Sequence, residues 1–325
     1  MTRRPATPIE ITLPASSANL GPAFDSAAMA LRLFLKVRAE ASDRFTVTAG
    51  GRDAELCGGV ENNLLIETYT NVLQSLGKDA VPLKIALDNK IPVGKGLGSS
   101  AAARLAGIAL ARHFGRLEWT DDQVVAEAAE REHHADNVAA CWFGGVVVVH
   151  LGKPNGSGRP HIETVQLNAR NSWPILLCIP EDRLPTEDAR AVLPEQYSRA
   201  DLVSSLQSAM LLTAALVKGR PDLLRDALKD CVHEPYRKSL CPLLEPLQSL
   251  AGTSGIMGAV LSGAGPSVLM VLDPKVPAEE IVERIEKQLR RRGIRAELVL
   301  TRVASQGARG RIRRVISAAS TRRSK

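Results

Sequence analysis

The chain reads Ile91-Pro-Val-Gly-Lys-Gly-Leu-Gly-Ser-Ser100 immediately before an alanine-rich stretch that extends to Phe114. That stretch predicts a helix over 99–114, so the glycines form a turn at the start of the helix. Glycine lets a backbone approach an anion closely, and the first turn of a helix presents free N–H groups and a positive dipole end. The segment therefore predicts a phosphate-binding loop, in which a first-turn hydroxyl can bind Mg²⁺. A plain tight turn is the alternative, since neither common glycine-rich phosphate motif is matched.

Around this loop, stretches with strand periodicity alternate with stretches of helix periodicity, which predicts an α+β protein. Glycines and capping residues mark the ends of the helices. The predicted strands are 9–13, 33–39, 82–87, 146–150, 173–179, 259–272 with an interruption at 262–266, and 295–303. The predicted helices are 63–76, 99–114, one that opens with the capping box Thr120-Asp-Asp-Gln123, 202–218, 221–231 and 277–292.

The 325 residues, of which 45% are hydrophobic, are enough for two domains. A polar turn at 153–159 is a candidate boundary, and we divide the chain into residues 1–165, residues 166–305 and a basic tail, 306–325. Five scattered cysteines without a C-x-x-C pair favour a reducing compartment. No apolar N-terminal segment or run of about 18 apolar residues is apparent. We therefore expect a cytoplasmic protein with no membrane partner.

The net charge of +7 is concentrated at one end of the chain. Eight arginine and lysine residues and no acidic residue occur from Arg302 onward, so the remainder of the chain is close to neutral. This distribution predicts a solvated tail, with weak electrostatic docking as the alternative. Aromatic residues make up 3% of the chain and do not alternate with the basic ones, so we expect no nucleic-acid partner.

Three segments resemble the motifs of the GHMP kinases, the superfamily of galactokinase, homoserine kinase and mevalonate kinase. They are the loop 92–102, the segment 14–25 with its sequence Pro-Ala-Ser-Ser-Ala-Asn-Leu-Gly-Pro, and Gly258-Ala-Val-Leu-Ser-Gly-Ala-Gly-Pro-Ser267. They occur in the order expected for that superfamily. The resemblance implies an N-terminal domain like ribosomal protein S5 domain 2 and a C-terminal ferredoxin-like α/β sandwich, with ATP and Mg²⁺ as cofactors.

Three further segments resemble those of the homoserine kinases: Glu132-His-His-Ala-Asp-Asn-Val138, Leu184-Pro-Thr-Glu-Asp-Ala-Arg190 and His233-Glu-Pro-Tyr-Arg237. This resemblance implies transfer of the γ-phosphoryl group of ATP to L-homoserine, giving O-phospho-L-homoserine for threonine biosynthesis. Two arginines and an aspartate suit such an acceptor, because arginine can hold a carboxylate and Asp25 an ammonium group. A homodimer is a possible assembly.

Carried over to this sequence, the resemblance implies four sets of site residues. The substrate would be surrounded by Asn19, Asp25, His134, Asp136, Asn137, Thr186, Arg190 and Arg237. The nucleotide would contact Asn63, Pro92, Val93, Gly94, Lys95, Gly96, Leu97, Gly98, Ser99, Ser100 and Ala101. Ser100 and Glu132 would bind Mg²⁺, with Glu130 as the alternative to Glu132. Asn137, Asp136 and Lys95 would be the catalytic residues, with Asp136 orienting or weakly basic because phosphoryl transfer depends mainly on positioning and charge.

Simpler interpretations stand beside these roles. Arg190 and Arg237 could form structural ion pairs, Lys95 could be solvated, and His133 is best explained as a residue at a helix end. Ala23 replaces a glycine that is usual in homoserine kinases and could require positive φ. The remaining alternatives are a GHMP-fold kinase for another hydroxy acid and a ligand-binding member without turnover.

Overall fold

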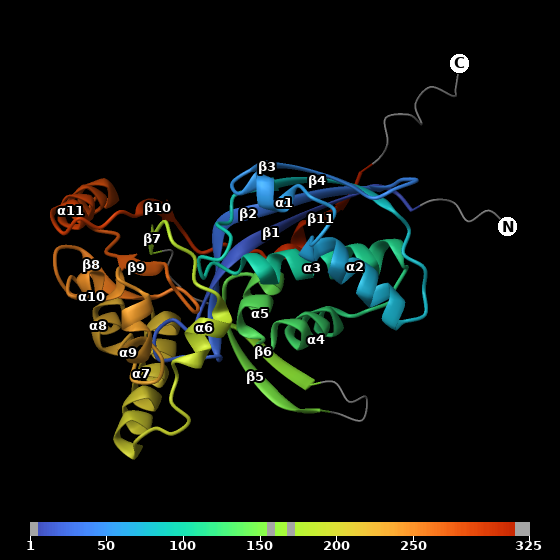
Figure 1. Ribbon diagram of the computed structural model, residues 1–325. Coiled ribbons are helices and arrows are strands. Elements are labelled where there is room, and N and C mark those ends of the chain that lie inside the picture. Colours follow the sequence, from blue (N-terminus) through green and yellow to red (C-terminus); the bar gives the residue numbers. More distant parts are fainter. Residues whose placement is uncertain (1–5, 155–159, 168–172, 316–325) are drawn as a thin grey trace.

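Two β-sheets form the frame of the molecule, one built mainly from the N-terminal half of the chain and the other from the C-terminal half (Figure 1). The computed structural model describes residues 6–154, 160–167 and 173–315. Buried side chains from both sheets join in one large apolar cluster, and a second cluster lies within the C-terminal half. The α+β prediction is confirmed, and the shared core fixes one sheet relative to the other.

The first sheet has seven strands in the order β11-β1-β2-β4-β3, with β5 paired to β2 and β6 paired to β5. Strands β3 and β4 are parallel, and the other pairs are antiparallel. β1 continues past its predicted end because its last residues pair with the start of β2. The strands are β1 (Ile9–Ala18), β2 (Ala27–Ala41), β3 (Thr46–Gly51), β4 (Leu83–Asn89), β5 (Val146–Pro154), β6 (Pro160–Leu167) and β11 (Ile312–Arg314).

The helices of the N-terminal half lie on one side of this sheet (Figure 1). The alanine-rich helix α3 has the predicted bounds and buries ten of its 16 residues, because alanine allows close packing on both strands and helices. The capping box at Thr120 is present at the start of α4. The helices are α1 (Ala54–Cys57), α2 (Leu64–Ser75), α3 (Ser99–Phe114), α4 (Asp121–Glu132) and α5 (Asp136–Phe143).

The second sheet is antiparallel, with the spatial order β10-β7-β9-β8. Numbered along the chain, this is the order fourth, first, third, second, with helices in the first and third connections, as in a ferredoxin-like sandwich. Buried apolar residues fill β7 and β9, the two central strands. The strands are β7 (Ile175–Ile179), β8 (Ile256–Leu261), β9 (Val268–Leu272) and β10 (Glu297–Thr301).

The helices of the C-terminal half are mostly short. The helix predicted over 221–231 ends at Ala227, four residues early, and the chain then turns toward the site. The helical segments are α6 (Thr186–Ala191), α7 (Arg199–Lys218), η1 (Pro221–Leu223), α8 (Leu224–Ala227), α9 (Glu234–Arg237), η2 (Lys238–Leu240), α10 (Leu244–Gln248), α11 (Ala278–Arg291) and η3 (Ala308–Arg311).

Helix α7 is longer and more apolar than the sequence interpretation allowed. Its 20 residues, and the mean hydropathy of 1.5 over an 18-residue window within them, satisfy the length and composition of a membrane span; 28% of that window is buried. One such helix is weak evidence for a span, because helices of soluble proteins meet the same test. One face of α7 packs into the large apolar cluster through Leu212, Ala215 and Leu216. On the other face, Leu206 and Met210 are exposed.

Two predicted boundaries are wrong. The polar turn at 153–159 joins β5 to β6, which pair within the first sheet, so it is not a domain boundary; residues 155–159 themselves lie outside the described part. The solvated tail does not begin at residue 306, because β11 adds to β1. Arg309 and Arg311 lie over the rings of Phe143 and Phe34, with 4.6 and 4.9 Å from guanidinium carbon to ring centroid. Cation–π stacking therefore binds part of the basic stretch to the first domain.

Candidate active site

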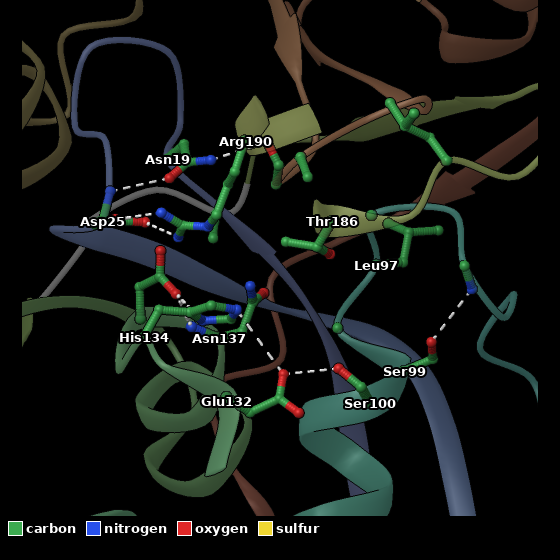
Figure 2. Close-up of a pocket in the computed structure, with 18 of the residues that line it drawn as sticks. Asn19, Asp25, Leu97, Ser99, Ser100, Glu132, His134, Asn137, Thr186 and Arg190 are labelled. Atoms are coloured by element: carbon green, nitrogen blue, oxygen red, sulfur yellow. Dashed lines mark hydrogen bonds and ion pairs between the residues drawn. The ribbon is translucent and has the colours of Figure 1, made fainter. Parts of the chain in front are cut away.

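Two adjoining cavities meet at the N-terminus of α3. The smaller, of about 80 Å³, contains the polar side chains drawn in Figure 2. The larger, of about 390 Å³, is more apolar and lies between α2 and the glycine loop. Both are lined by Gly94, Ser99, Ser100, Leu184 and Thr186. A group bound in the larger cavity can therefore reach one bound in the smaller across the first turn of α3.

The backbone of the glycine loop takes a conformation that requires glycine. Gly94, Gly96 and Gly98 have φ of 70°, 72° and 68°, which L-residues with a Cβ rarely adopt. A Cβ on Gly96 would overlap the Ser262 carbonyl oxygen, and one on Gly98 would overlap the Ser16 hydroxyl. Gly98 is also the N-cap of α3 and brings no side-chain cap, so the first N–H groups of the helix face the cavities. These are the features of an anion site.

The Lys95 side chain points out of the loop, away from both cavity linings. Its ammonium donates to the carbonyl oxygens of Pro180 at 2.9 Å, Asp182 at 2.5 Å and Glu181. Only 8% of Lys95 is exposed, so the solvated alternative is wrong. Burial lowers its pKa, with the nearby Arg183 acting in the same direction. Its three donors are all used, and each hydrogen bond to a charged donor contributes about 1.5–3 kcal/mol.

Ser100 and Glu132 face each other at the N-terminus of α3 (Figure 2). The Ser100 hydroxyl donates to Glu132 Oε2 at 2.7 Å, and Arg104 Nε donates to Glu132 Oε1 at 2.6 Å. The Glu132 side chain is 6% exposed, whereas Glu130 is exposed. His133 is the left-handed C-cap of α4, as expected for a residue at a helix end. Thus Glu132, not Glu130, lies beside the loop.

Oxygen donors of this kind fit Mg²⁺, which prefers carboxylate, hydroxyl, phosphate and water ligands. The described residues contain no group of three or more His, Cys, Asp or Glu side chains that could hold a metal by themselves. One carboxylate and one hydroxyl at a phosphate loop instead suit an ion that takes its remaining ligands from a nucleotide and water. Only the ligand pair Ser100 and Glu132 can be named from this geometry.

Asp136 and Asn137 begin α5 at the base of the polar cavity. Asp136 is buried, and its Oδ1 accepts the Asn137 backbone N–H at 2.6 Å and lies 3.1 Å from His134 Nδ1. Burial alone would lower the pKa of His134, but the hydrogen bond to Asp136 and the nearby Glu132 carboxylate outweigh burial, and the pKa is raised. The Asn137 amide oxygen accepts from the Ser16 hydroxyl at 2.8 Å. This set can orient a hydroxyl group.

Asp25 and Arg190 form an ion pair at the other end of the cavity, with Arg190 donating through both nitrogens at 3.1 and 2.7 Å (Figure 2). Asn19 supports Asp25, since its Oδ1 accepts the Asp25 backbone N–H at 3.0 Å. Both charged side chains are 38% exposed. Arg190 therefore does form an ion pair, as the simpler interpretation predicted. The pair lines the cavity, however, and is exposed enough to contact a ligand.

Arg237 is 1% exposed and reaches the cavity from α9. Its Nε donates to the Ala189 carbonyl at 2.8 Å, and a second nitrogen lies 3.1 Å from His233 Nδ1. His233 Nε2 lies 2.9 Å from the Gly21 carbonyl, so a neutral imidazole satisfies both contacts. Burial lowers the pKa of His233, and the charge of Arg237 acts in the same direction. Within the described part of the chain, no acidic side chain forms an ion pair with Arg237.

Phe24 is the platform between the two arginines. The guanidinium carbons of Arg190 and Arg237 lie 5.4 and 5.5 Å from its ring centroid, so both positive charges are held against the same aromatic ring. Ala23, the residue before Phe24, is not among the residues with positive φ. Alanine in place of the usual glycine therefore costs no backbone strain here.

Asn63 lies in the lining of the larger cavity, but its amide is used within the chain. Its Oδ1 caps α2 by accepting from Leu65 and Ile66, and its Nδ2 donates to the carbonyls of Cys57 and Gly59. The Asn63 side chain thus holds the segment before α2 in place.

The cavity linings contain most of the predicted site residues. The eight predicted substrate residues all line the smaller cavity: Asn19, Asp25, His134, Asp136, Asn137, Thr186, Arg190 and Arg237. Pro92, Lys95 and Ala101 line neither. Arg104 was missed, although its position four residues after Ser100 on a predicted helix indicated a shared face. Asp53 and Arg183 were also missed, and no sequence signal marks them because they meet across 130 residues.

Comparison with known proteins agrees with this geometry. Residues 63–145 match the model of the GHMP kinase N-terminal domain, and residues 212–291 match that of the GHMP kinase C-terminal domain. The chain is 38% identical to a homoserine kinase of Solibacter usitatus over 299 residues, 91% of this chain and 95% of that one. A homoserine kinase of Deinococcus radiodurans is 38% identical over 271 residues, 83% and 86% of the two chains.

A solved structure gives the same result for the fold. The crystal structure of homoserine kinase from Cytophaga hutchinsonii superposes with a TM-score of 0.77 at 26% identity, covering 94% of this chain and 98% of that chain. Both sheets and the helices between them are therefore shared along nearly the whole length.

Proposed function

Because this chain belongs to the homoserine kinases of the GHMP kinase superfamily, we propose that it transfers the γ-phosphoryl group of ATP to the side-chain hydroxyl of L-homoserine. The family and the two-domain fold predicted from the motifs are confirmed. The chain is an ATP-dependent kinase. What the proposal adds is the acceptor, its product O-phospho-L-homoserine and the roles of individual residues.

The observation that carries the proposal is the placement of opposite charges in one small polar cavity. Asp25 suits an ammonium group, while Arg190 and Arg237 over Phe24 suit a carboxylate. Asp136 and Asn137 line the same cavity close to Ser100 and Glu132. An amino acid with a side-chain hydroxyl can thus be held at its charged end while the hydroxyl faces the phosphate loop.

The chain's own residues bring the reactants together rather than activate the nucleophile strongly. Phosphoryl transfer passes through a loose transition state, so positioning and charge stabilisation dominate. Ser100 and Glu132 would hold Mg²⁺, which would supply positive charge beside the phosphates. The N–H groups at the start of α3 bind the phosphate oxygens, and Asn137 positions the acceptor hydroxyl. Asp136 orients Asn137 and His134, since its Oδ1 accepts the Asn137 backbone N–H and lies within hydrogen-bond distance of His134 Nδ1.

A panel of acceptors tests the proposal directly. We expect ADP release with L-homoserine, and kcat/KM at least about 30-fold lower with homoserine amide or 4-hydroxybutyrate, because each lacks one charge and leaves a protein group unpaired. Mevalonate and galactose complete the panel. Equal kcat/KM for homoserine and 4-hydroxybutyrate would favour a kinase for another hydroxy acid, and absence of ADP release with every acceptor would favour a ligand-binding protein.

Cytoplasmic location and a homodimer stay predictions. All five cysteines are free, as a reducing compartment requires. For a dimer, the exposed apolar face of α7 is the surface to test, because two antiparallel copies would bring Asp201 near one end against Lys218 at the other. Light scattering of the wild type and of Met210→Glu, which places a charge in the middle of that face, distinguishes a dimer from a monomer.

A further inference from the structure

Hydrogen bonds as well as packing join the phosphate loop to the segment 180–184, which follows β7. The buried Lys95 ammonium takes the carbonyl oxygens of Pro180, Glu181 and Asp182, three consecutive residues. Three donors that meet three carbonyls in one turn of chain hold both the position and the curvature of that turn. The loop and the turn therefore move together.

Two additional contacts join the same segments. The Leu184 backbone N–H donates to the Gly94 carbonyl at 3.2 Å, and the Arg183 side chain lies against Gly94. Arg183 also pairs with Asp53 at 3.2 Å, and Asp53 accepts the Val93 backbone N–H at 2.9 Å. The 180–184 segment is thus held to both ends of the Val93–Lys95 stretch.

The segment 180–184 leads directly into α6, which carries two acceptor-site residues. Thr186 is the first residue of α6 and lines both cavities, and Arg190 lies one turn further along and pairs with Asp25. The segment 180–184 therefore links the glycine loop to the end of the cavity where Arg190 lies.

We propose that Lys95 is a positioning residue that couples nucleotide binding to acceptor binding. A nucleotide that fixes the glycine loop also fixes the segment 180–184 through Lys95, and α6 then holds Thr186 and Arg190 in the arrangement that binds the acceptor. The coupling is reciprocal, since an effect of nucleotide on acceptor affinity requires the same effect of acceptor on nucleotide affinity. This inference rests on the proposed function for the identity of the acceptor.

The geometry separates this role from the phosphate contact expected from the sequence. To touch a phosphate, the Lys95 ammonium would have to leave all three carbonyls and its buried position. A phosphate ligand would contribute to the affinity for nucleotide alone, whereas a coupling residue contributes to the ratio of two affinities. That ratio is the quantity to measure.

The experiment is calorimetric titration of L-homoserine into the full-length protein, without nucleotide and with a saturating non-hydrolysable ATP analogue and Mg²⁺. The ratio of the two dissociation constants is the coupling factor. We compare the wild type with Lys95→Met, which removes the donors, and with Lys95→Arg, which keeps the charge. The matched control is Lys78→Met, because the Lys78 ammonium also binds a backbone carbonyl, that of Gly115, but lies outside the site.

We expect a wild-type coupling factor on the order of 5- to 150-fold. Lys95→Met should bring it close to one while each ligand alone binds within about threefold of wild type, Lys95→Arg should restore part of it, and Lys78→Met should leave it unchanged. A wild-type factor of one, or an unchanged factor in Lys95→Met, overturns the proposal. So does a loss of affinity for the nucleotide analogue alone with the coupling retained, which would make Lys95 a phosphate ligand.

If Lys95→Met does not fold, Lys95→Gln decides the question, because glutamine keeps a polar side chain but is neutral, is one atom shorter than lysine and cannot donate to all three carbonyls. A reduced coupling factor in that variant supports the proposal, and an unchanged factor overturns it. Turnover of homoserine by the wild type is measured separately. Its absence would refute the proposed function without bearing on the tie between the loop and the 180–184 segment.

Discussion

The exchange of Glu132 for glutamine, with the same exchange at Glu130 as its control, tests the proposed Mg²⁺ site. Both residues lie on α4, but the Glu132 carboxylate is enclosed between Ser100 and Arg104, whereas Glu130 is exposed. Glutamine keeps the size of the side chain and one oxygen acceptor, and it removes the negative charge. Glu132→Gln therefore tests the charge, and Glu130→Gln tests any general effect of the exchange on the helix.

The expected loss follows from Coulomb attraction in a partly solvated site. Two unit charges about 4 Å apart interact by about 4 kcal/mol at an effective dielectric constant near 20, which we take as the upper limit. With about half of that as the lower limit, kcat/KM should fall by roughly 30-fold to 1,000-fold. The loss of stability should be small, because Arg104 is a quarter exposed and can be hydrated: about 1 kcal/mol or less, or about 2–4 °C in Tm.

Coupled ADP release with homoserine, measured over a range of Mg²⁺ concentrations, gives the kinetic result, and thermal melting gives the stability. Glu132→Gln should need more Mg²⁺ for half-maximal activity, and Glu130→Gln should remain within about twofold of wild type. A fully active Glu132→Gln would remove Glu132 from the metal site. A larger effect of Glu130→Gln than of Glu132→Gln would show that the roles of the two residues are reversed.

Three further perturbations address the rest of the molecule. Burial raises the pKa of Glu234 to about 8 from 4.5, so the folded state binds an extra proton in this window and the free energy of unfolding falls as pH rises from about 4.5 to 8. Glu234→Gln should lack this decrease, with a Tm gain that grows from near zero at pH 5 to a maximum above pH 8; parallel Tm curves for the two proteins would contradict it. Truncation after residue 315 should leave turnover near normal, whereas truncation after residue 305 removes β11 from β1 and should lower Tm by several degrees, and equal Tm values would show that β11 contributes nothing. Asp25→Asn should lower kcat/KM for homoserine by at least about 30-fold and narrow its advantage over 4-hydroxybutyrate, and an unchanged ratio between these acceptors would exclude Asp25 as the ammonium partner.

Local signals in the sequence predict the elements of this fold well. The glycine turn, the alanine-rich helix and the capping box at Thr120 act over a few residues, and α3 and α4 begin where those residues indicate. The failures concern contacts between distant parts of the chain. Residues 306–314 carry mostly arginine and glycine, and only the free edge of β1 and the rings of Phe34 and Phe143 turn that stretch into structure.

The same division applies to the site. Motif resemblance predicts which residues gather in the polar cavity, because each motif is a short run of sequence. It does not predict which way a side chain points within its run. The neighbours of Lys95, Gly94 and Gly96, line the cavity, whereas the Lys95 ammonium binds the carbonyl oxygens of residues 180–182. Nor does it predict Arg183, whose partner Asp53 is 130 residues away.

The ion pair between Asp25 and Arg190 explains why the acceptor should carry both charges. In this structure the two groups satisfy each other, at 2.7 and 3.1 Å. A zwitterion that enters between them replaces one ion pair with two, so no charge is left alone. An acceptor with a carboxylate only can engage Arg190 but leaves Asp25 unpaired, and a partner lost from such a pair costs about 2–5 kcal/mol. The pair thus acts against singly charged acceptors, which is the discrimination expected between homoserine and 4-hydroxybutyrate.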